Sequence, residues 1–323
     1  MRTRLTELLQ IEHPVMLAGM GGVSYHRLVA AVSEAGGFGC LGAGTMGTAE
    51  MVDEIRRVRA ATGKPFGVDL LTALPEQMLA SVEHLVAERV PVFVAALGVP
   101  REVIDLCHAN NVIVVNMCGK VRHAIAAVEA GCDLVVAQGT EAGGHTGAVA
   151  TMPLVPQVVD AVGDRVPVVA AGGIFDGRGL AAALALGADG VWVGTRFIAT
   201  PEARAVPGYK DALLSTHEDG TVVSRAFSGK TMRVVRNDTT QHYEQHPEEL
   251  KPFPEQIAIA LGEGFMHLPF GDDARDVDPK RECYPAGQGV GAVDELVPAA
   301  ELVERFVADA ERAIAGMNLT AGA

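Results

Sequence analysis

The sequence predicts an α/β protein folded as a (β/α)8 barrel, with a helical insertion after the eighth strand. Short apolar runs each end in a glycine, proline or polar turn, and helical patterns separate these runs. Continuous apolar strands that alternate with helices indicate a parallel sheet covered on both faces. An internal repeat of one strand-and-helix unit supports the same fold.

The apolar runs are the predicted barrel strands, and they number eight. They span Pro14–Ala18, Phe38–Gly42, Phe66–Leu71, Val92–Leu97, Val112–Asn116, Asp133–Gln138, Pro167–Ala171 and Val191–Thr195. Eight is the number at which such units close into a TIM barrel. The alternative is an open doubly wound sheet, which uses the same alternation of strands and helices.

Helical patterns lie between the runs. Helical spacing separates Met78, Val82, Leu85 and Arg89. Arg27–Ala35 and Gly179–Leu186 are alanine-rich, and each is followed by a glycine that fits a helix C-cap. These segments supply the helices that a parallel sheet needs on its faces.

The internal repeat links two parts of the predicted barrel. GCDLVVAQG, starting at Gly131, resembles GADGVWVGT, starting at Gly187, with a glycine and an aspartate at matching offsets. The composition agrees with this fold, because 49% apolar residues can bury a large core and 37 glycines suit tight turns.

A long segment separates the last predicted strand from a final amphipathic helix at Ala299–Ala315. We therefore predict a barrel formed by residues 1–200 and 292–323, with residues 201–291 inserted as a lid or substrate subdomain. Prolines recur throughout the insertion. We expect it to build a helical lid over the barrel.

Charge and cysteine usage exclude several classes of protein. A net charge of −14 argues against a nucleic-acid or anionic-membrane partner. Five cysteines without a CxxC pair argue against a disulfide framework or zinc ribbon, and predict buried thiols in a reducing compartment. No run approaches the ~18 apolar residues of a membrane span. We expect a cytoplasmic enzyme.

The most informative motif is AQGTEAGGHTG at residues 137–147, which follows the strand Asp133–Gln138. It places His145 among glycines at the carboxyl end of a strand, where α/β proteins keep their sites. An imidazole with a pKa near ~6.5 can take a proton at neutral pH, so we expect a general base or hydrogen-bond donor. The alternative is a structural histidine. Glu141 is expected either to orient His145 or to lie in solvent.

The loops after the seventh and eighth strands have the composition of a phosphate site. They read AAGGIFDGRG and VGTRF, in which Gly172, Gly173 and Gly194 allow close backbone approach and Thr195 adds a hydroxyl donor. TIM barrels commonly bind phosphate at these loops. We expect a mononucleotide-type cofactor or a phosphorylated substrate; the alternative is a pair of ordinary tight turns.

Other motifs carry weaker signals. GMGG at residues 19–22 lacks the spacing of a dinucleotide fingerprint, and Met20 is expected to pack on a flat apolar ring. His242 and His246 could share a helix face, but no third metal ligand accompanies them, so a solvated face is expected and no metal is predicted. GxSxG is absent, and the cysteines lack a catalytic setting.

Taken together, EAGGHTG, PVVAAGGIFDGRG, LGADGVWVGTRF and AGQGVG resemble the motifs of nitronate monooxygenases, FMN-dependent barrels formerly called 2-nitropropane dioxygenases. The resemblance runs from Glu12 to Gly287. It implies a flavoprotein oxidoreductase that oxidises alkyl nitronates with O2 to a carbonyl compound and nitrite, and it suggests a homodimer. Flavin-dependent enoyl-acyl-carrier-protein reductases and NAD(P)H:quinone reductases share much of the same motifs.

The resemblance assigns roles to residues of this chain. His145 matches the catalytic histidine, which would remove the α-proton of a neutral nitroalkane or hydrogen-bond the nitro group. Apolar lid residues would keep water away. The water-excluding residues expected are Phe227, Met232, Phe265 and Met266, and the FMN contacts implied are Asp69, Gln138, Gly143, Gly173, Trp192, Val193, Gly194 and Thr195. Met20 and Gly172 are added to the expected cofactor contacts by the arguments from the GMGG motif and the phosphate loops.

One position departs from the pattern of the family. Many relatives read GVN in the third strand, whereas this chain reads GVD, ending at Asp69. An ionised carboxylate accepts hydrogen bonds but cannot donate them. The flavin contact there must therefore change partner, involve water, or keep the acid protonated.

Two other functions compete with this interpretation. An NAD(P)H-driven reductase of a quinone or enoyl thioester would use the same FMN site. A flavin-free barrel enzyme acting on a phosphorylated metabolite would need only the phosphate loops.

Overall fold

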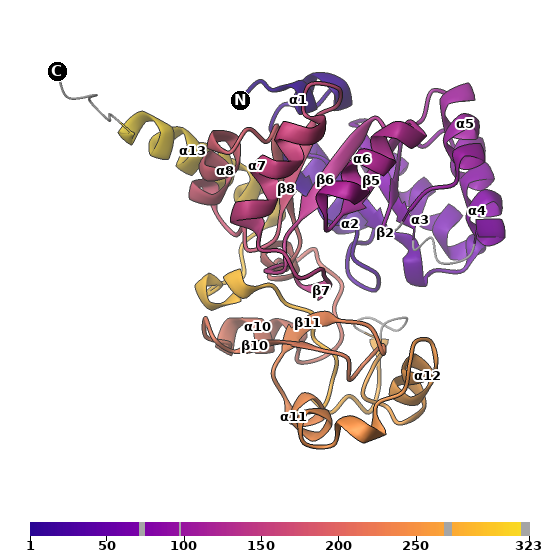
Figure 1. Ribbon diagram of the computed structural model, residues 1–323, viewed down its shortest axis with the longest axis vertical. Helices are drawn as coiled ribbons and strands as arrows, with labels where there is room; N and C mark the ends of the chain where they lie inside the picture. Colours follow the sequence, from indigo (N-terminus) through magenta and orange to yellow (C-terminus); the bar gives the residue numbers. More distant parts are fainter. Residues whose placement is uncertain (71–74, 97, 268–272, 318–323) are drawn as a thin grey trace.

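A barrel of eight parallel strands forms the centre of the protein (Figure 1). The computed structural model describes residues 1–70, 75–96, 98–267 and 273–317. The strands coincide with the predicted apolar runs, although Leu71 and Leu97, at the ends of two runs, lie outside the described residues. The barrel strands are β1 (Val15–Leu17), β2 (Gly39–Gly42), β3 (Phe66–Leu70), β4 (Val92–Ala95), β5 (Ile113–Cys118), β6 (Leu134–Gln138), β8 (Val168–Ala171) and β9 (Gly190–Val193).

The sheet closes almost completely on itself. Its strand order is β1-β9-β8-β6-β5-β4-β3-β2, and β1 and β9 pair in parallel. Between β1 and β2 a single parallel bridge joins Met16 and Phe38. There, the Leu17 amide donates to the Phe38 carbonyl at 2.8 Å, and the Phe38 amide donates to the Val15 carbonyl at 2.9 Å. The predicted TIM barrel is confirmed, and an open doubly wound sheet is excluded.

Helices cover the outside of the strands (Figure 1). Gly36 and Gly187, the predicted C-cap residues, have positive φ angles of 82° and 88°. Gly177 lets two helices approach closely, because a Cβ there would lie 2.3 Å from the Phe306 carbonyl oxygen. The covering helices are α2 (His26–Glu34), α3 (Thr48–Ala61), α4 (Pro75–Ala87), α5 (Arg101–Ala109), α6 (Val121–Ala130), α7 (Thr151–Val162), α8 (Gly177–Ala185) and α13 (Ala299–Gly316).

Side-chain alternation along the strands creates two apolar layers. Met16 and Trp192 point into the barrel, whereas Val15 and Val191 pack between the strands and the outer helices. The short helix α1 (Arg4–Leu9) adds Leu5 and Leu9 to the inner cluster. A packed interior leaves the carboxyl rim as the place where a ligand can enter.

The segment after β9 differs from the predicted helical lid. It contains helices and also the antiparallel strands β10 and β11. This region has its own apolar core, in which the rings of Phe227 and Phe265 meet edge to face at 6.0 Å. Its elements are α9 (Thr195–Ile198), α10 (Tyr209–Ser215), β10 (Thr221–Ser224), β11 (Met232–Val235), α11 (Asp238–Gln245), η2 (Pro247–Glu249), α12 (Glu255–Gly262) and η4 (Gln288–Ala292).

The inserted hairpin is joined to the barrel by a third strand. The two-residue β7 (Gly144–His145) lies in the loop after β6 and pairs antiparallel with β11, with Met232 opposite His145. The prolines of the segment led us to expect helices, but the β-branched residues of β10 and β11 form a hairpin that needs this partner. The boundaries of the insertion at residues 201 and 291 stay a prediction.

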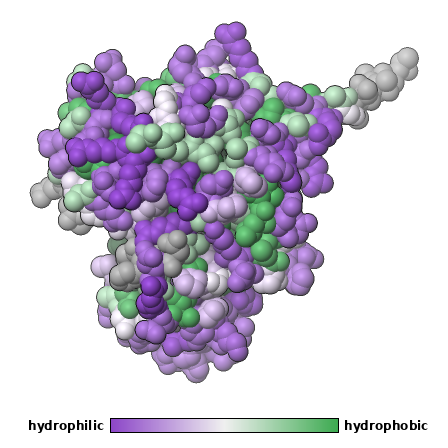
Figure 2. Space-filling model, turned by 180° about the vertical axis from the view of Figure 1, so that it is seen from behind, coloured by the Kyte–Doolittle hydropathy of each residue, from purple (hydrophilic) through white to green (hydrophobic). Residues whose placement is uncertain are grey.

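The surface and the thiols agree with the composition. Hydrophilic residues cover much of the face opposite that of Figure 1, interrupted by smaller hydrophobic patches (Figure 2). All five cysteines are buried and free, as their spacing predicted. No helix within the described residues is long and apolar enough to cross a membrane.

Candidate active site

One large cavity lies at the carboxyl rim of the barrel, and the inserted segment forms part of its wall. Its volume is about 1180 Å³. Single-ligand pockets usually measure about 300–1,000 Å³. The cavity therefore has room for a cofactor together with a substrate.

The cavity collects the residues predicted for the site, with one exception. Val193 is 1% exposed and packs in the outer apolar layer, because its neighbours Trp192 and Gly194 take the inward positions. The residues that line the cavity as predicted are Met20, Asp69, Gln138, Gly143, His145, Gly172, Gly173, Trp192, Gly194 and Thr195.

The loop after β8 is a backbone cradle. Gly172 and Gly173 have φ angles of 105° and 72°, which side-chain-bearing residues rarely adopt. A Cβ at Gly172 would lie 2.8 Å from Thr151 Oγ1 and 2.9 Å from the Gly139 carbonyl oxygen. The Gly173 amide has no hydrogen-bond partner among the described residues, so it is available to an anion.

Thr195 completes this cradle from the loop after β9. Its Oγ1 accepts a hydrogen bond from the Gly287 amide at 2.9 Å, which leaves the hydroxyl hydrogen free to be donated. Gly287 belongs to the AGQGVG motif, and Gly143 packs against it so closely that a Cβ would lie 2.8 Å from the Gly287 nitrogen. Donors from two neighbouring loops thus fit a phosphate-bearing cofactor.

Met20 borders the cradle from the loop after β1. A Cβ at Gly194 would lie 3.3 Å from the Met20 sulfur, so the two residues adjoin at the rim. The Met20 amide donates to Ser24 Oγ at 2.7 Å, which fixes the turn at the GMGG motif. The motif acts here as a tight turn rather than as a dinucleotide site.

Asp69 is a buried acid at the end of β3. It is 9% exposed, and a Cβ at Gly19 would lie 2.2 Å from the Asp69 Cβ. Burial raises the pKa of the Asp69 carboxyl well above its usual value, and no cation among the described residues forms an ion pair with it. A protonated carboxyl can donate a hydrogen bond, as an asparagine amide does. Of the three alternatives for this position, the structure favours the protonated acid.

His145 is held from two sides. The Gln138 side-chain amide donates to the His145 carbonyl at 2.7 Å, and β11 pairs with His145 through Met232. The side chain is exposed to the open cavity that it lines. Desolvation lowers the pKa of the imidazole, and the positive charge of Lys230 lowers it further. The ring is therefore neutral at neutral pH, as a general base requires.

Glu141 takes neither of its two predicted roles. Its Oε2 accepts from the Thr151 amide and the Thr151 hydroxyl, both at 2.7 Å. The carboxylate therefore holds the start of α7, where unpaired amides need acceptors, and it does not orient His145. The side chain that contacts the His145 ring is Ser228, whose Oγ lies 2.9 Å from Nε2. Ser228 lies in no motif that the sequence analysis recognised.

The four apolar lid residues divide into two pairs. Met232 and Met266 line the cavity. Phe227 and Phe265 pack against each other within the insertion's own core and are fully buried. Of the four, the methionines lie where they could exclude water from a substrate. The phenylalanine rings instead stabilise the core of the inserted segment.

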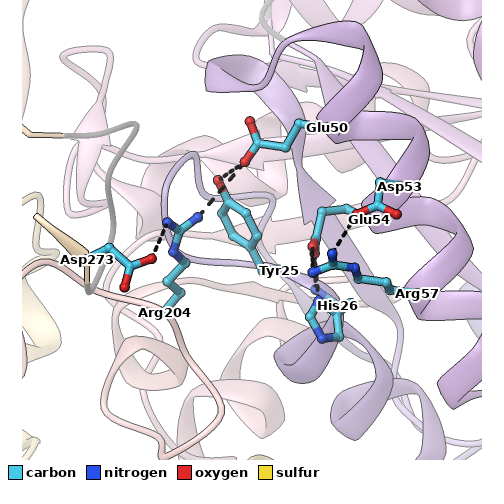
Figure 3. Close-up of polar contacts among 8 residues, drawn as sticks. All are labelled: Tyr25, His26, Glu50, Asp53, Glu54, Arg57, Arg204 and Asp273. Atoms are coloured by element: carbon cyan, nitrogen blue, oxygen red, sulfur yellow. Dashed lines mark hydrogen bonds and ion pairs between the residues drawn. The ribbon is translucent and has the colours of Figure 1, made fainter.

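A second, polar pocket of about 640 Å³ lies between α2, α3 and the start of the insertion (Figure 3). Arg204 stacks over the ring of Tyr25 at 4.5 Å, and the Tyr25 hydroxyl donates to Glu50 at 3.1 Å. Burial, followed by the charge of Glu50, raises the Tyr25 pKa to about 12. Nearby, His26 Nδ1 lies 2.8 Å from Glu54. These groups pair with one another and tie the insertion to the barrel helices.

His242 and His246 lie on one side of α11 with ring centroids 4.9 Å apart. No third ligand was expected beside them, but the following turn brings Glu248 and Glu249 close. His242 Nε2 lies 2.7 Å from Glu249, and His246 Nδ1 lies 3.5 Å from Glu248. Ligand atoms of His246 and the two glutamates lie within 4.8 Å of one another. These groups contact one another at the exposed surface, as expected of a solvated face.

Comparison with known proteins identifies relatives over nearly the whole chain. A family model described as nitronate monooxygenase matches residues 2–80 and 76–309. A probable nitronate monooxygenase of Staphylococcus aureus (strain Newman) is 35% identical over 300 residues, covering 79% of this chain and 84% of that protein.

Two solved structures resemble this one closely. FabK from Thermotoga maritima superposes with a TM-score of 0.88 and 35% identity, covering 98% of both chains. The nitroalkane oxidase from Streptomyces ansochromogenes superposes with a TM-score of 0.83 and 33% identity, covering 97% of this chain and 99% of that chain.

Proposed function

The chain belongs to the nitronate monooxygenase family, and from this membership we propose that it uses FMN and O2 to oxidise alkyl nitronates and nitroalkanes. The products are a carbonyl compound and nitrite. The observation that carries the proposal is His145, a neutral imidazole on the wall of a cavity that also contains a backbone cradle for phosphate. The likeness to a nitroalkane oxidase supports the same substrate class.

FMN fits the donors at the rim. Gly172, Gly173 and Thr195 would hold its single phosphate, while Asp69 and Trp192 would border its ring. FMN, once bound, supplies the electron-transfer chemistry. Burial raises the pKa of the Asp69 carboxyl and so favours its protonated form, which would donate a hydrogen bond to a ring acceptor as an ionised aspartate could not.

His145 would act on the substrate carbon. For a neutral nitroalkane, the imidazole takes the α-proton while the electron pair of the C–H bond moves onto the nitro group. The positively charged Lys230 lies close enough to lower the His145 pKa, and it would also stabilise the developing nitronate anion. For a preformed nitronate no proton has to be removed, so His145 would matter less.

A second candidate function rests on the charge of the cavity wall. Lys120, Arg225 and Lys230 line the cavity and form no ion pair with a described residue. Such cations suit the phosphates of NAD(P)H or of a phosphopantetheine-type thioester. This function is an NAD(P)H-dependent reductase of a quinone or enoyl thioester, with the same FMN site.

Anaerobic mixing of the purified flavoprotein with ethyl nitronate, and separately with NADH and NADPH, distinguishes the two functions. We expect the nitronate to bleach the flavin absorbance rapidly, and admission of O2 to restore it with formation of nitrite. Rapid bleaching by a nicotinamide without bleaching by the nitronate would establish the reductase instead. A purified protein that binds no flavin would point to a flavin-free enzyme.

The cellular location is inferred from the cysteines. Five buried, unpaired thiols support a cytoplasmic location. The homodimer and the absence of a nucleic-acid partner stay predictions. Fractionation of cells tests the location, and the mass of the purified protein in solution tests the homodimer.

A further inference from the structure

We infer that Ser228 is a positioning residue that keeps the neutral imidazole of His145 protonated on Nε2, so that Nδ1 accepts the substrate proton. The inference deepens the proposed function, since it assigns an atom to the base. It starts from the short contact between His145 Nε2 and Ser228 Oγ, at 2.9 Å.

Ser228 is fully buried and anchored by one neighbouring peptide. The Lys230 amide donates to Ser228 Oγ at 3.3 Å, and the Ser228 hydroxyl donates to the Lys230 carbonyl at 3.2 Å. A hydroxyl has one hydrogen and two lone pairs. With the hydrogen and one lone pair used by Lys230, the remaining lone pair faces Nε2 and requires a hydrogen there.

The opposite arrangement satisfies fewer groups. If the hydroxyl donated to an unprotonated Nε2, the Lys230 carbonyl would lose the hydrogen bond it receives from Ser228. The ring would then present Nδ1–H to the cavity and could not accept a proton there. With Nε2–H the buried Ser228 hydroxyl satisfies all three of its contacts at once, to the Lys230 carbonyl, the Lys230 amide and the imidazole, so this arrangement is favoured.

Nδ1 is the ring nitrogen that remains free to accept a proton. His145 lines the cavity, and its only side-chain hydrogen bond to the described residues is the one from Nε2. When Nδ1 takes the α-proton, the C–H bond breaks, an N–H bond forms, and the electron pair moves onto the nitro group. The ring becomes an imidazolium, whose Nε2–H already donates to Ser228. No hydrogen bond has to change during the transfer, which keeps the barrier low.

Charged groups around the ring set its proton affinity, whereas Ser228 sets which nitrogen carries the proton. Lys230 is the charged residue identified as acting on His145, and its effect opposes protonation. Ser228 carries no charge and acts through geometry. Its position on the insertion also means that the insertion, and not only the barrel, prepares the base.

Nitrogen NMR of histidine-labelled protein tests the tautomer without any turnover. His145→Ala identifies the His145 signals by their disappearance. We expect wild-type protein to show a protonated Nε2 and an unprotonated Nδ1. Ser228→Ala should show a mixture of both tautomers. A wild-type ring protonated on Nδ1, or an unchanged tautomer in Ser228→Ala, would overturn the inference.

Kinetics provide the second measurement. Since a general base contributes about 10²–10⁴-fold, we expect Ser228→Ala to lower kcat/KM for nitroethane about 10-fold or more while ethyl nitronate changes less than about 3-fold. Ser228→Thr, which keeps the hydroxyl, should restore the nitroethane rate. Ser224→Ala is the matched control, because that hydroxyl accepts from the Ala226 amide in the same lobe and does not contact His145.

The two measurements separate failure of this inference from failure of the proposed function. If the protein oxidises neither compound but the tautomer still depends on Ser228, the proposed function is wrong and the positioning role stands. If both compounds are oxidised and Ser228→Ala slows them equally, the function stands and the positioning role is wrong.

Discussion

The barrel rim and the inserted lobe build opposite walls of one cavity in different ways. The rim offers a backbone loop with positive φ angles at Gly172 and Gly173, beside the Thr195 hydroxyl, and these suit the phosphate that we propose there. The insertion uses side chains, since Ser228 and Lys230 act on His145. Backbone donors do not depend on side-chain identity, whereas the side chains of the insertion can change by single substitutions.

The largest expected effect is on flavin binding, and it should come from a substitution in the backbone cradle after β8. Gly172→Val places a branched side chain at a φ of 105° and within 2.8 Å of Thr151 Oγ1. We expect nearly complete loss of bound flavin, because strain of this kind costs about 1–3 kcal/mol and the side chain also fills the cradle. The flavin-to-protein absorbance ratio measures this effect.

Gly63→Ala is the control for that variant, because no atom lies within 4 Å of a Cβ at Gly63. It should keep its full complement of flavin. Circular dichroism should show that both variants are folded. Full flavin occupancy in Gly172→Val would show that the loop after β8 does not hold the cofactor.

The next largest effect should come from removing the base while leaving the cradle intact. We expect His145→Ala to keep its flavin and to lose about 10²–10⁴-fold in kcat/KM for nitroethane. Turnover of ethyl nitronate should fall much less, because no proton has to be removed. Equal losses on the two substrates would show that His145 is not the general base.

The buried carboxyl of Asp69 should make the free energy of unfolding depend on pH. Its raised pKa means that the folded state holds a proton that the unfolded state releases above a pKa of about 3.9. Its contribution to stability is therefore full below that pH and is lost as the pH rises toward the folded pKa. The loss amounts to about 1.4 kcal/mol for each pH unit in that window.

Asp69→Asn removes this titration but keeps a hydrogen-bond donor. We expect its free energy of unfolding, relative to wild type, to rise between pH 5 and pH 8, with flavin binding retained. Urea unfolding of the flavin-free protein at both pH values measures the change. A constant difference between the two proteins would show that Asp69 ionises normally.

The smallest effect should come from the charge of Lys230. Lys230→Ala removes a cation that lowers the His145 pKa, so the pKa should rise. Since the base works only when unprotonated, the acid limb of the pH profile for nitroethane should move to higher pH, by less than about one unit. The exposed Lys251, in the same lobe, provides the control variant Lys251→Ala.

The barrel half of the molecule could be predicted from sequence because its signals are local. Each strand is a short apolar run, and each rim glycine follows directly after a strand. Once eight units close, the positions of Asp69, Gln138 and Gly172 around one rim follow from the fold. Val193 was misplaced because strand alternation turns its side chain outward.

The inserted half could not be predicted in the same way, because its contacts join residues far apart in the chain. Ser228 reaches His145 across 83 positions, and β11 pairs with a two-residue strand that no periodicity could indicate. Glu141 was misjudged because its partner, Thr151, becomes a neighbour only when the loop folds back on the start of α7. The methionines and phenylalanines of the lobe look alike in sequence, and packing alone separates them.

The pairing of β7 with β11 has a consequence for the timing of catalysis. Because His145 is itself a strand residue of the insertion's sheet, its position depends on how that lobe sits against the barrel. A displacement of the hairpin would carry the ring away from the substrate carbon at the same moment that the cavity opens to water. Solvent access to the cavity and alignment of the base would then change together, since both depend on the same strand pairing.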